Sequence, residues 1–412
     1  MGKPLVILLA GGVGKNFAPL IVNKTLVPFC GKPVLQHMIE TIEQSGFHEV
    51  LIVTNHENEQ WLESYQPFNI TIETHIQDEP LGMADALLKI ESKIKGRPIL
   101  VMNAVDMINP TFFKQMYQLS LDVYSFVVAK EIDSYFPGGY VKVEGNKAIG
   151  IVEKPEPGTE PSKLLNLVFH YYSDPTEFFP YLRAASSLKD DHYEQALNRF
   201  MQEKEVRCLT YQDYWQKLKY AYHVLDVMDI FLQNRVKSHR ATTAYVSPHA
   251  IIEGNVFIDE YAHIDAGAII KGPAYIGKNV KVGNHSLVRQ SMIEEGSVIG
   301  FGSEVARSYV GPRSMLHHNF LGDTIFESDI NPSWGTTFAN FRLDNKPVIF
   351  KRHDTSLQTT RAKLGAVVAN GVFFGVNCSV MPGIAIGARS KIFPQTTVFS
   401  PVTADETVKN SK

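Results

Sequence analysis

Two different patterns of apolar residues follow one another along this chain. In the first half, short apolar runs alternate with segments whose apolar residues recur at helical spacing. The runs predict strands at residues 5–10, 49–54, 70–75 and 99–103, and the helical spacing predicts helices at 34–45 and 82–93. Such alternation is typical of an α/β domain, in which helices cover both faces of a mostly parallel sheet. Ligands of these sheets bind beyond the C-terminal ends of the strands.

After about residue 240, an aliphatic or aromatic residue recurs at every sixth position. The positions in phase are Val246, Ile252, Ile258, Ile264, Ile270, Ile276, Val282, Val288, Val368, Phe374, Val380, Ile386, Ile392 and Val398. A period of six fits neither an α-helix nor a twisted sheet, but it fits a triangular coil in which each flat side uses one hexapeptide. The pattern therefore predicts a left-handed parallel β-helix of hexapeptide repeats, with these side chains stacked inward.

The repeat loses its phase between its two runs. Residues 342–363 are polar and contain Pro347, so we expect an external loop that leaves the β-helix. The last residues, from about Ala404, are expected to form a frayed tail. The predicted domains are an α/β domain at 1–238 and a β-helix domain at 244–403, with the loop insertion at 342–363.

Composition and charge argue against several classes of protein. The 412 residues carry a net charge of -3 and have a pI near 6.5, so nothing favours nucleic acid or an anionic membrane as a partner. Three widely separated cysteines without a CxxC pair support neither a disulfide framework nor a zinc site. The apolar run at 5–10 fits a buried first strand better than a signal peptide, and no run is long enough to span a bilayer. We therefore expect a cytoplasmic protein.

A glycine-rich loop follows the first predicted strand. Ala10, Gly11, Gly12 and Gly14 lie between that strand and a long helix, and Lys15 comes directly after them. Glycines let backbone N–H groups approach a phosphate and point at it. The spacing matches neither a Walker loop nor a dinucleotide-binding fingerprint. By itself the loop is a weak indication of a phosphate site, because many strand–turn junctions contain glycine.

The residues around this loop resemble the signature of the sugar-1-phosphate nucleotidylyltransferase family. Beyond the glycines, the matching residues are Pro19, Leu20, Lys24, Pro28, Gly31, Lys32 and Pro33. The resemblance implies that Lys24 contacts phosphate. Taken alone, Lys24 would be read as an ordinary solvated lysine.

Further matches follow in the order of the family and extend the resemblance over residues 1–236. They are Gln77 and Gly82 for the base, Asp106 for a magnesium ion, and Gly139, Glu153, Lys154 and Asn166 for the sugar and its phosphate. The resemblance implies a Rossmann-like mixed sheet. It also implies two substrates, a nucleoside triphosphate (UTP or dTTP) and a sugar-1-phosphate.

The reaction that the resemblance implies is an in-line displacement that gives a nucleoside diphosphate sugar and pyrophosphate. A phosphate monoester is already anionic, so it can attack the α-phosphorus without a side-chain nucleophile. Catalysis then consists mostly of positioning and charge neutralisation. In this scheme Asp106 and Asp226 hold Mg²⁺, while Lys24 and Lys15 offset the remaining charge.

Three positions depart from the pattern of the family. Asn16 stands where the family has an arginine, and a neutral amide cannot replace a bidentate cationic grip on phosphate. Val105 replaces a glycine just before the first metal aspartate. The Gly-Thr after the second metal aspartate is missing. Aligning on the metal ligand selects Asp226, whereas aligning on the following helix selects His223 and makes Asp229 a helix-start residue. These departures leave open a catalytically weakened, sugar-nucleotide-binding regulatory subunit.

Two segments of the predicted β-helix resemble the bifunctional N-acetylglucosamine-1-phosphate uridylyltransferase/glucosamine-1-phosphate acetyltransferase family. The resemblance makes His317 a general base, and makes Asn340 and Lys346 substrate contacts, in an acetyltransferase that uses acetyl-CoA. Phe320 replaces a tyrosine that contacts substrate in that family. Left-handed β-helices often form trimers, so we expect a homo-oligomer. The alternative is that the β-helix serves assembly alone.

Overall fold

The computed structural model describes residues 3–121, 124–186 and 191–409. The chain divides into two compact units. One comprises Met1–Val13 and Val34–Trp215, and the other comprises Gly14–Pro33 and Gln216–Lys412. Residues 14–33, which carry most of the family signature and are called the signature segment below, therefore belong to the same unit as the β-helix.

Nine strands of the first unit form one mixed sheet within the described residues. In spatial order they are β5 (Thr71–Ile76), β4 (Glu49–Thr54), β1 (Leu5–Leu9), β6 (Ile99–Asn103), β11 (Leu164–Tyr172), β8 (Ser125–Glu131), β12 (Val206–Tyr211), β10 (Lys147–Glu153) and β9 (Gly139–Glu144). The first four are parallel, β11 is antiparallel to both of its neighbours, and β8 is parallel to β12. The predicted Rossmann-like mixed sheet is confirmed.

Six α-helices and a short 3₁₀-helix accompany this sheet in the described part of the unit. They are α1 (Val34–Gln44), α2 (His56–Ser64), α3 (Gly82–Ile94), α4 (Pro110–Leu119), η1 (Pro175–Glu177), α5 (Phe179–Ala184) and α6 (His192–Glu203). Each predicted strand and helix ends within one residue of its observed bounds. No described helix, in this unit or the other, combines the length and the apolar content needed to cross a membrane.

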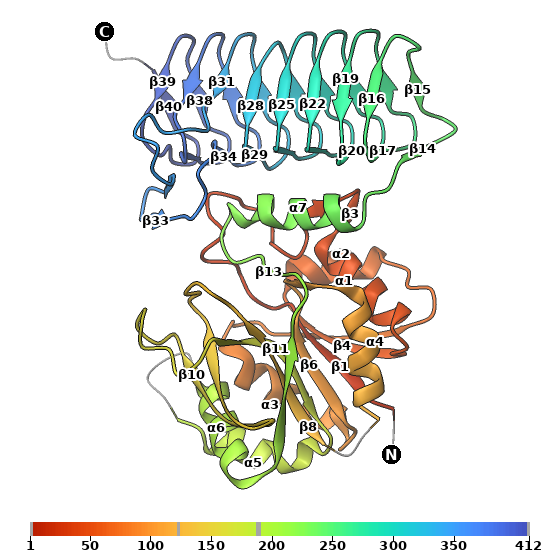
Figure 1. Ribbon diagram of the computed structural model, residues 1–412, viewed down its shortest axis with the longest axis vertical. Coiled ribbons are helices and arrows are strands. Elements are labelled where there is room, and N and C mark those ends of the chain that lie inside the picture. The colour runs from red at the N-terminus through yellow and green to blue at the C-terminus, as the bar shows by residue number, and fades with distance from the viewer. Residues whose placement is uncertain (1–2, 122–123, 187–190, 410–412) are drawn as a thin grey trace. The chain divides into compact units, whose positions relative to one another are not determined.

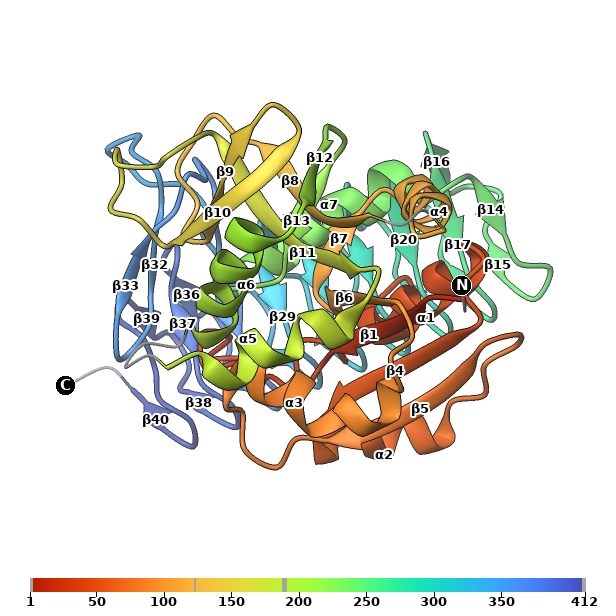
Figure 2. The same ribbon diagram turned by 90° about the horizontal axis from the view of Figure 1, so that it is seen from below.

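Apolar side chains on both faces of the sheet are buried. Helices α3, α5 and α6 pack on one face, where Ile7, Leu51 and Ile99 join the same core (Figure 2). Val6 and Leu8 alternate with Ile7 along β1 and are equally buried, because successive side chains of a strand point to opposite faces. Both faces of β1 are therefore covered, as the alternation of strands and helices along the sequence predicts.

The second unit contains a parallel β-helix of three sides (Figure 1). The first side comprises β14 (His239–Arg240), β17 (Val256–Ile258), β20 (Ala274–Ile276), β23 (Met292–Ile293), β26 (Tyr309–Val310), β29 (Ile325–Phe326), β34 (Val367–Val368) and β37 (Ala385–Ile386). The second side comprises β16 (Ile251–Glu253), β19 (Ile269–Lys271), β22 (Leu287–Arg289), β25 (Glu304–Ala306), β28 (Phe320–Gly322), β31 (Thr337–Phe338), β36 (Ser379–Val380) and β39 (Thr397–Val398). The third side comprises β15 (Tyr245–Val246), β18 (His263–Ile264), β21 (Lys281–Val282), β24 (Val298–Ile299), β27 (Met315–Leu316), β30 (Asn331–Pro332), β35 (Phe373–Phe374), β38 (Lys391–Ile392) and β40 (Thr407–Val408).

The register of the strands stacks equivalent residues of successive coils. Ile252 pairs with Ile270, which pairs with Val288 in the next coil. Ile270 and Val288 are fully buried, as the hexapeptide period predicts, and the fold class is confirmed. Ile252 is 38% exposed, because β16 is the first strand of its side and no preceding coil covers it.

The signature segment packs on the first side of the β-helix together with α7 (His223–Asn234). The segment contains the short hairpin of β2 (Pro28–Phe29) and β3 (Lys32–Pro33). The ring of Phe29 stacks on that of Phe231 at 5.2 Å and meets that of Tyr309 at 5.6 Å. All three rings are buried, so the core of this segment is shared with the β-helix.

The two irregular segments of the β-helix are ordered. The insertion at 342–363 contains an antiparallel hairpin of β32 (Ile349–Lys351) and β33 (Ser356–Gln358). The prediction of a frayed tail from Ala404 is wrong for the described residues, because β40 pairs in parallel with β38. Val408 lies on Ile392 there, so the coil continues one strand beyond the predicted end, although Val408 comes ten positions after Val398 and is out of phase with the six-residue period.

Leu316 and Met315 are neighbours on β27 whose side chains point to opposite sides. Leu316 is fully buried in the β-helix core, whereas Met315 is 43% exposed. We expect Leu316→Ala to lower the unfolding free energy of the β-helix by about 2–5 kcal/mol, because it removes buried methyl groups and leaves a cavity. Met315→Ala, the matched control, should change it by less than about 0.5 kcal/mol. Urea unfolding followed by circular dichroism measures both, and equal losses would contradict inward stacking.

Candidate functional site

The glycine loop has a fixed stem and an open tip. Ala10 donates its N–H to the carbonyl of Val53 at 2.7 Å, and its own carbonyl accepts from the side chain of Asn58 at 2.8 Å. Gly12 is exposed, and among the described residues a Cβ added to it would meet no atom within 4 Å. Open space beside a glycine backbone is what close approach of a phosphate requires.

Gln77, predicted to recognise the base, lies against this loop. It is buried just after β5, and a Cβ added to Gly11 would lie 3.1 Å from its Oε1. Its Nε2 donates to the carbonyl of Gly82 at 3.2 Å and to the carboxylate of Asp85 at 2.7 Å. The amide is therefore held in one orientation, with its donor group engaged and its acceptor on the side of the loop.

Gly139, Glu153, Lys154 and Asn166, called the sugar cluster below, come together on adjoining parts of β9, β10 and β11. A Cβ added to Gly139 would lie 2.9 Å from Oε2 of Glu153 and 3.6 Å from Cβ of Asn166, so a larger residue does not fit between them. Oε1 of Glu153 pairs with the exposed ammonium of Lys154 at 3.2 Å. A carboxylate, an ammonium and an amide thus lie around one glycine.

A buried chain of hydrogen bonds orients Asn166. Oδ1 of Asn166 lies 2.9 Å from Nε2 of His170, and Nδ1 of that ring lies 2.7 Å from the hydroxyl of Tyr193. An amide oxygen only accepts, so Nε2 carries the proton and Nδ1 accepts from Tyr193. Burial lowers the pKa of His170 to about 3, which keeps the ring neutral. The oxygen of the Asn166 side chain is therefore engaged by His170, and the two N–H donors of its amide are not used in this chain of hydrogen bonds.

Asp106, the first predicted metal ligand, is buried at the start of β7 (Asp106–Ile108). Its Oδ1 accepts from the indole of Trp215 at 2.8 Å, and that ring packs edge-on against Phe136 at 5.0 Å. The carbonyl of Phe136 accepts from the N–H of Gly138, beside Gly139. A continuous set of contacts therefore joins Asp106 to the sugar cluster.

In the second unit, Lys24 lies in a turn that Asn23 organises. Oδ1 of the buried Asn23 accepts from the N–H of Thr25 at 3.1 Å and from its hydroxyl at 2.9 Å. The carbonyl of Asn23 accepts from the N–H of Leu26 at 2.8 Å. The side chain of Lys24 is half-buried at the centre of this turn. The turn fixes the backbone from which the predicted phosphate-binding lysine projects.

A carboxylate of the β-helix holds the backbone that precedes this turn. Oε1 of Glu327 accepts from the N–H groups of Ile21 at 2.9 Å and Val22 at 2.6 Å. Its Oε2 accepts from the N–H of Asn370 at 2.7 Å. Glu327 therefore joins the signature segment to the β-helix, and such charge-assisted hydrogen bonds are stronger than neutral ones.

A second carboxylate holds the end of the signature segment. Oε2 of the buried Glu294 accepts from the N–H of Gly31 at 3.0 Å, and Tyr309 donates to the carbonyl of Pro28 at 2.8 Å. The other oxygen of Glu294 is buried and has no hydrogen-bond partner within the described ranges. Burial raises the pKa of Glu294 to about 8, although the N–H of Gly31 favours the charged form.

Lys15, the cationic residue that follows the glycines of the loop, is exposed to solvent. Lys15 and Asn16 are both exposed, and the N–H of Phe17 donates to the carbonyl of Gly14 at 2.7 Å to close a turn. The carbonyl of Asn16 accepts from Nη1 of Arg352, in the insertion, at 3.2 Å. An arginine is thus beside position 16, although it comes from another part of the chain.

Asp226, the second predicted metal ligand, is engaged by another arginine of the insertion. It lies in the first turn of α7, where its carboxylate is ion-paired and hydrogen-bonded to Arg361. A divalent cation requires these oxygens and is repelled by a guanidinium, so Asp226 as arranged does not fit Mg²⁺. Over residues 3–121, 124–186 and 191–409, no group of three or more His, Cys, Asp or Glu side chains could hold a metal ion.

The alternative alignment of this region fits no better. His223 begins α7, so Asp229 lies in the middle of the helix and the prediction that it starts one is wrong. The turn at 219–222 already begins the helix, which is why it starts earlier than expected. His223 is buried, its Nδ1 lies 2.9 Å from the carbonyl of Lys217, and burial lowers its pKa. It serves this turn rather than a metal ion.

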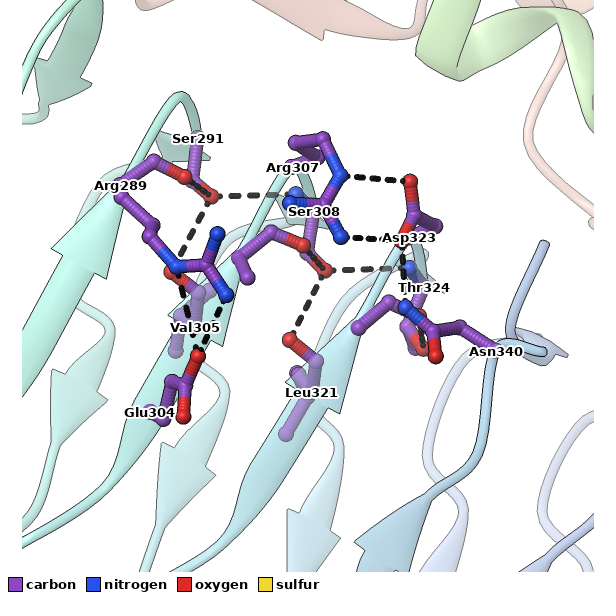
Figure 3. A network of polar contacts seen from close by, with 12 residues as sticks. Arg289, Ser291, Glu304, Val305, Arg307, Ser308, Leu321, Asp323, Thr324 and Asn340 are labelled. Atoms are coloured by element: carbon purple, nitrogen blue, oxygen red, sulfur yellow. Dashed lines mark hydrogen bonds and ion pairs between the residues drawn. The ribbon is translucent and has the colours of Figure 1, made fainter. Parts of the chain in front are cut away.

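The residues of the predicted acetyltransferase site lie apart within the chain. His317 is exposed at the corner before β28, whereas Asn340 follows β31. These strands are parallel neighbours, so the two residues flank opposite ends of the second side. Asn340 donates to Asp323 at 2.6 Å, and Asp323 is also paired with Arg307 (Figure 3). Lys346 is exposed in the insertion.

Several residues that support these sites were not found from the sequence. They are Trp215 behind Asp106, His170 behind Asn166, Glu327 and Glu294 behind the signature segment, and Arg352 and Arg361 in the insertion. None belongs to a motif. The one available signal was the presence of three arginines in a polar insertion.

Two family models and several known proteins match the chain. The model described as "Nucleotidyl transferase" matches residues 5–218, and the "GMPPB C-terminal domain" matches residues 252–330. The bifunctional sugar-1-phosphate nucleotidylyltransferase/acetyltransferase of Sulfurisphaera tokodaii is 28% identical over 397 residues, covering 95% of this chain and 96% of that protein. The bifunctional protein GlmU of Methanococcus vannielii is 27% identical over 395 residues, with 94% and 92% covered.

More distant matches agree on the first unit. Mannose-1-phosphate guanylyltransferase 1 of Arabidopsis thaliana is 26% identical over 356 residues, covering 78% of this chain and 92% of that protein. The solved structure of apo UDP-glucose pyrophosphorylase has a TM-score of 0.51 at 18% identity, covering 57% of this chain and all of that one. At this identity the likeness shows the fold alone.

Glu294 should make stability depend on pH. Its folded pKa of about 8 lies above the ordinary value of 4.5, so between these values the folded state holds a proton that the unfolded state has lost. Stability contributed in this way falls as pH rises through that window. Glu294→Gln should match the native protein near pH 5 and be more stable near pH 8.5. Thermal midpoints across this range measure the effect, with exposed Glu295→Gln as the control. Parallel pH profiles for native protein and Glu294→Gln would refute the assignment.

Proposed function

Because the chain belongs to the nucleotidyl transferase family, we propose that it couples a nucleoside triphosphate to a sugar-1-phosphate and releases pyrophosphate. The family and enzyme class predicted from the sequence are confirmed by the match over residues 5–218. The observation that carries the proposal is the set of contacts in the first unit that joins Asp106 to the sugar cluster.

The environment of Gln77 supports a base with a ring N–H. Its Nε2 is engaged by Gly82 and Asp85, so its Oε1 is the group available on the side of Gly11. An acceptor at this place suits the N3–H donor that uracil and thymine both present. This favours UTP or dTTP as the nucleotide and does not separate them.

The sugar cluster supports recognition of a hydroxyl-rich ring with an attached phosphate. The carboxylate of Glu153 accepts from hydroxyls, and Asn166 offers N–H donors that His170 holds in place. The exposed ammonium of Lys154 supplies a positive charge for the sugar phosphate. These three chemistries match the two parts of a sugar-1-phosphate.

In the proposed reaction, a phosphate oxygen of the sugar-1-phosphate forms a bond to the α-phosphorus. The bond from that phosphorus to the bridging oxygen breaks, and pyrophosphate leaves with the electron pair. The chain contributes position and charge: the glycine loop approaches the phosphates, and Lys24 and Lys15 offset negative charge. We propose Mg²⁺ as the cation that accompanies the nucleotide, with Asp106 as the carboxylate that this chain offers to it.

Pyrophosphate release from UTP or dTTP, Mg²⁺ and a panel of sugar-1-phosphates tests the reaction. We expect Lys24→Ala and Asp106→Asn each to lower kcat by at least about 100-fold, because each removes electrostatic stabilisation of a highly charged transition state. Lys163→Ala is the control, since this lysine is paired with Asp133 on the surface and lies outside the site.

Silence of the folded native chain across the whole panel would overturn the proposal. The alternative, a sugar-nucleotide-binding regulatory subunit, would then bind UDP-sugars in calorimetry without turnover. A gain of pyrophosphate release in Asn16→Arg would show that the chain had lost an ancestral activity.

A second candidate function, CoA-dependent acetyl transfer, has its own support. The bifunctional relative from Sulfurisphaera tokodaii, whose name includes an acetyltransferase, matches across 95% of this chain, including the β-helix. His317 presents an exposed imidazole at a corner of that β-helix. We propose acetyl-CoA as the co-substrate and a homotrimer as the assembly. The free cysteines Cys30, Cys208 and Cys378 suit the reducing cytoplasm, which is the location that we propose.

Release of free thiol from acetyl-CoA with an amino sugar phosphate tests this second function. His317→Ala should lower the rate by about 100-fold or more if the imidazole takes the proton of the amine. His263→Ala, another exposed histidine on the β-helix, is the control and should leave the rate unchanged. An unchanged rate in His317→Ala would remove the proposed role.

A further inference from the structure

The insertion is an ordered arm attached to the β-helix. Phe341 and Lys363 form an antiparallel bridge at its base, and the N–H of Lys351 donates to the carbonyl of Gly383 at 2.7 Å. Phe350 is fully buried, and its ring meets that of Tyr222, at the start of α7, edge to face at 5.6 Å. The arm therefore has one apolar anchor on the N-terminal end of α7.

Two arginines of this arm meet two of the positions at which the chain departs from the family pattern. Arg352 donates to the carbonyl of Asn16 at 3.2 Å, where the family carries its own arginine. Arg361 pairs with Asp226, where the Gly-Thr after the second metal aspartate is missing. Both contacts lie within the unit that contains the β-helix. The same arm thus supplies a guanidinium at each of these two places.

The pair of Arg361 and Asp226 is well shielded from water. Their side chains are 19% and 29% exposed. At such a site water screens the attraction between opposite charges only in part, so the guanidinium is a strong competitor for the carboxylate. Nε of Arg361 is buried and has no hydrogen-bond acceptor among the described residues. The carboxylate of Asp229, one turn further along α7, also feels the charge of Arg361, but only Asp226 is hydrogen-bonded to it among the described residues.

We propose that Arg361 takes Asp226 out of metal ligation and makes it a positioning residue that holds the arm to α7. The carboxylate of Asp226 serves the guanidinium, so Asp226 lies outside the metal site that the proposed function assigns to Asp106. This inference rests on the proposed nucleotidyl transfer and specifies which of the two predicted aspartates binds the metal ion. It can be tested by metal binding, without measuring turnover.

Binding of Mn²⁺ alone to the full chain, followed by the electron paramagnetic resonance signal of free Mn²⁺, tests this assignment. Asp226→Asn should leave the affinity unchanged within about twofold, whereas Arg361→Gln should raise it about tenfold by releasing a carboxylate. The gain should disappear in the double variant Asp226→Asn/Arg361→Gln. Arg342→Gln is the matched control, because Arg342 pairs with Asp344 in the same insertion and should not alter the affinity.

Two results would overturn the proposal. One is a loss of about tenfold or more in Mn²⁺ affinity on Asp226→Asn alone, which would make Asp226 a ligand in the native chain. The other is an unchanged affinity in folded Arg361→Gln. If that variant does not fold, Arg361→Lys keeps the charge and should bind Mn²⁺ as weakly as the native chain; a tenfold gain there would overturn the proposal as well. These measurements follow the binding of Mn²⁺ alone, so they can be interpreted even if the chain releases no pyrophosphate.

Discussion

The signature segment depends on hydrogen-bond acceptors that lie in the β-helix. The N–H groups of Ile21 and Val22 bond to Glu327, and that of Gly31 bonds to Glu294. Hydrogen bonds from N–H groups to a carboxylate are stronger than neutral ones, so these carboxylates stabilise the conformation of the segment. Lys24 lies between these two attachments, and its position is therefore set by the β-helix. The β-helix, for which assembly alone was one possible role, thus also supports the lysine that is predicted to bind phosphate.

The polar groups of the first unit are arranged by a second layer of contacts. Trp215 fixes one oxygen of Asp106, and His170 fixes the amide of Asn166. Both supports are held in place by aromatic neighbours, and the neutral state of His170 follows from its burial. Catalysis by position and charge requires such fixed groups, because a displacement at phosphorus uses no nucleophile from the protein.

Two of the departures from the family pattern lie next to arginines of the insertion, which belongs to the same unit. Position 16 holds an asparagine in place of the arginine of the family, and Arg352 of the arm donates a hydrogen bond to its carbonyl. Asp226, at the position predicted for a metal aspartate, lacks the expected Gly-Thr after it and is paired with a guanidinium of the arm. At both positions a charged group of a distant segment lies where the family pattern has a local one.

The sequence by itself determined the sheet, its helices and the β-helix, because inward-facing positions recur with the period of the local structure. It also ordered the candidate residues from the glycine loop to Asn166, whose roles stay predictions. It misjudged the tail, where Val408 continues the coil out of phase with the six-residue period, and the start of α7. Only the tertiary structure decided that Asp226 meets Arg361, 135 positions away, and that Ile21 meets Glu327, 306 positions away. No sequence pattern near a charged side chain or a backbone N–H indicates which distant residue it will contact. These pairs therefore depend on how the whole chain folds.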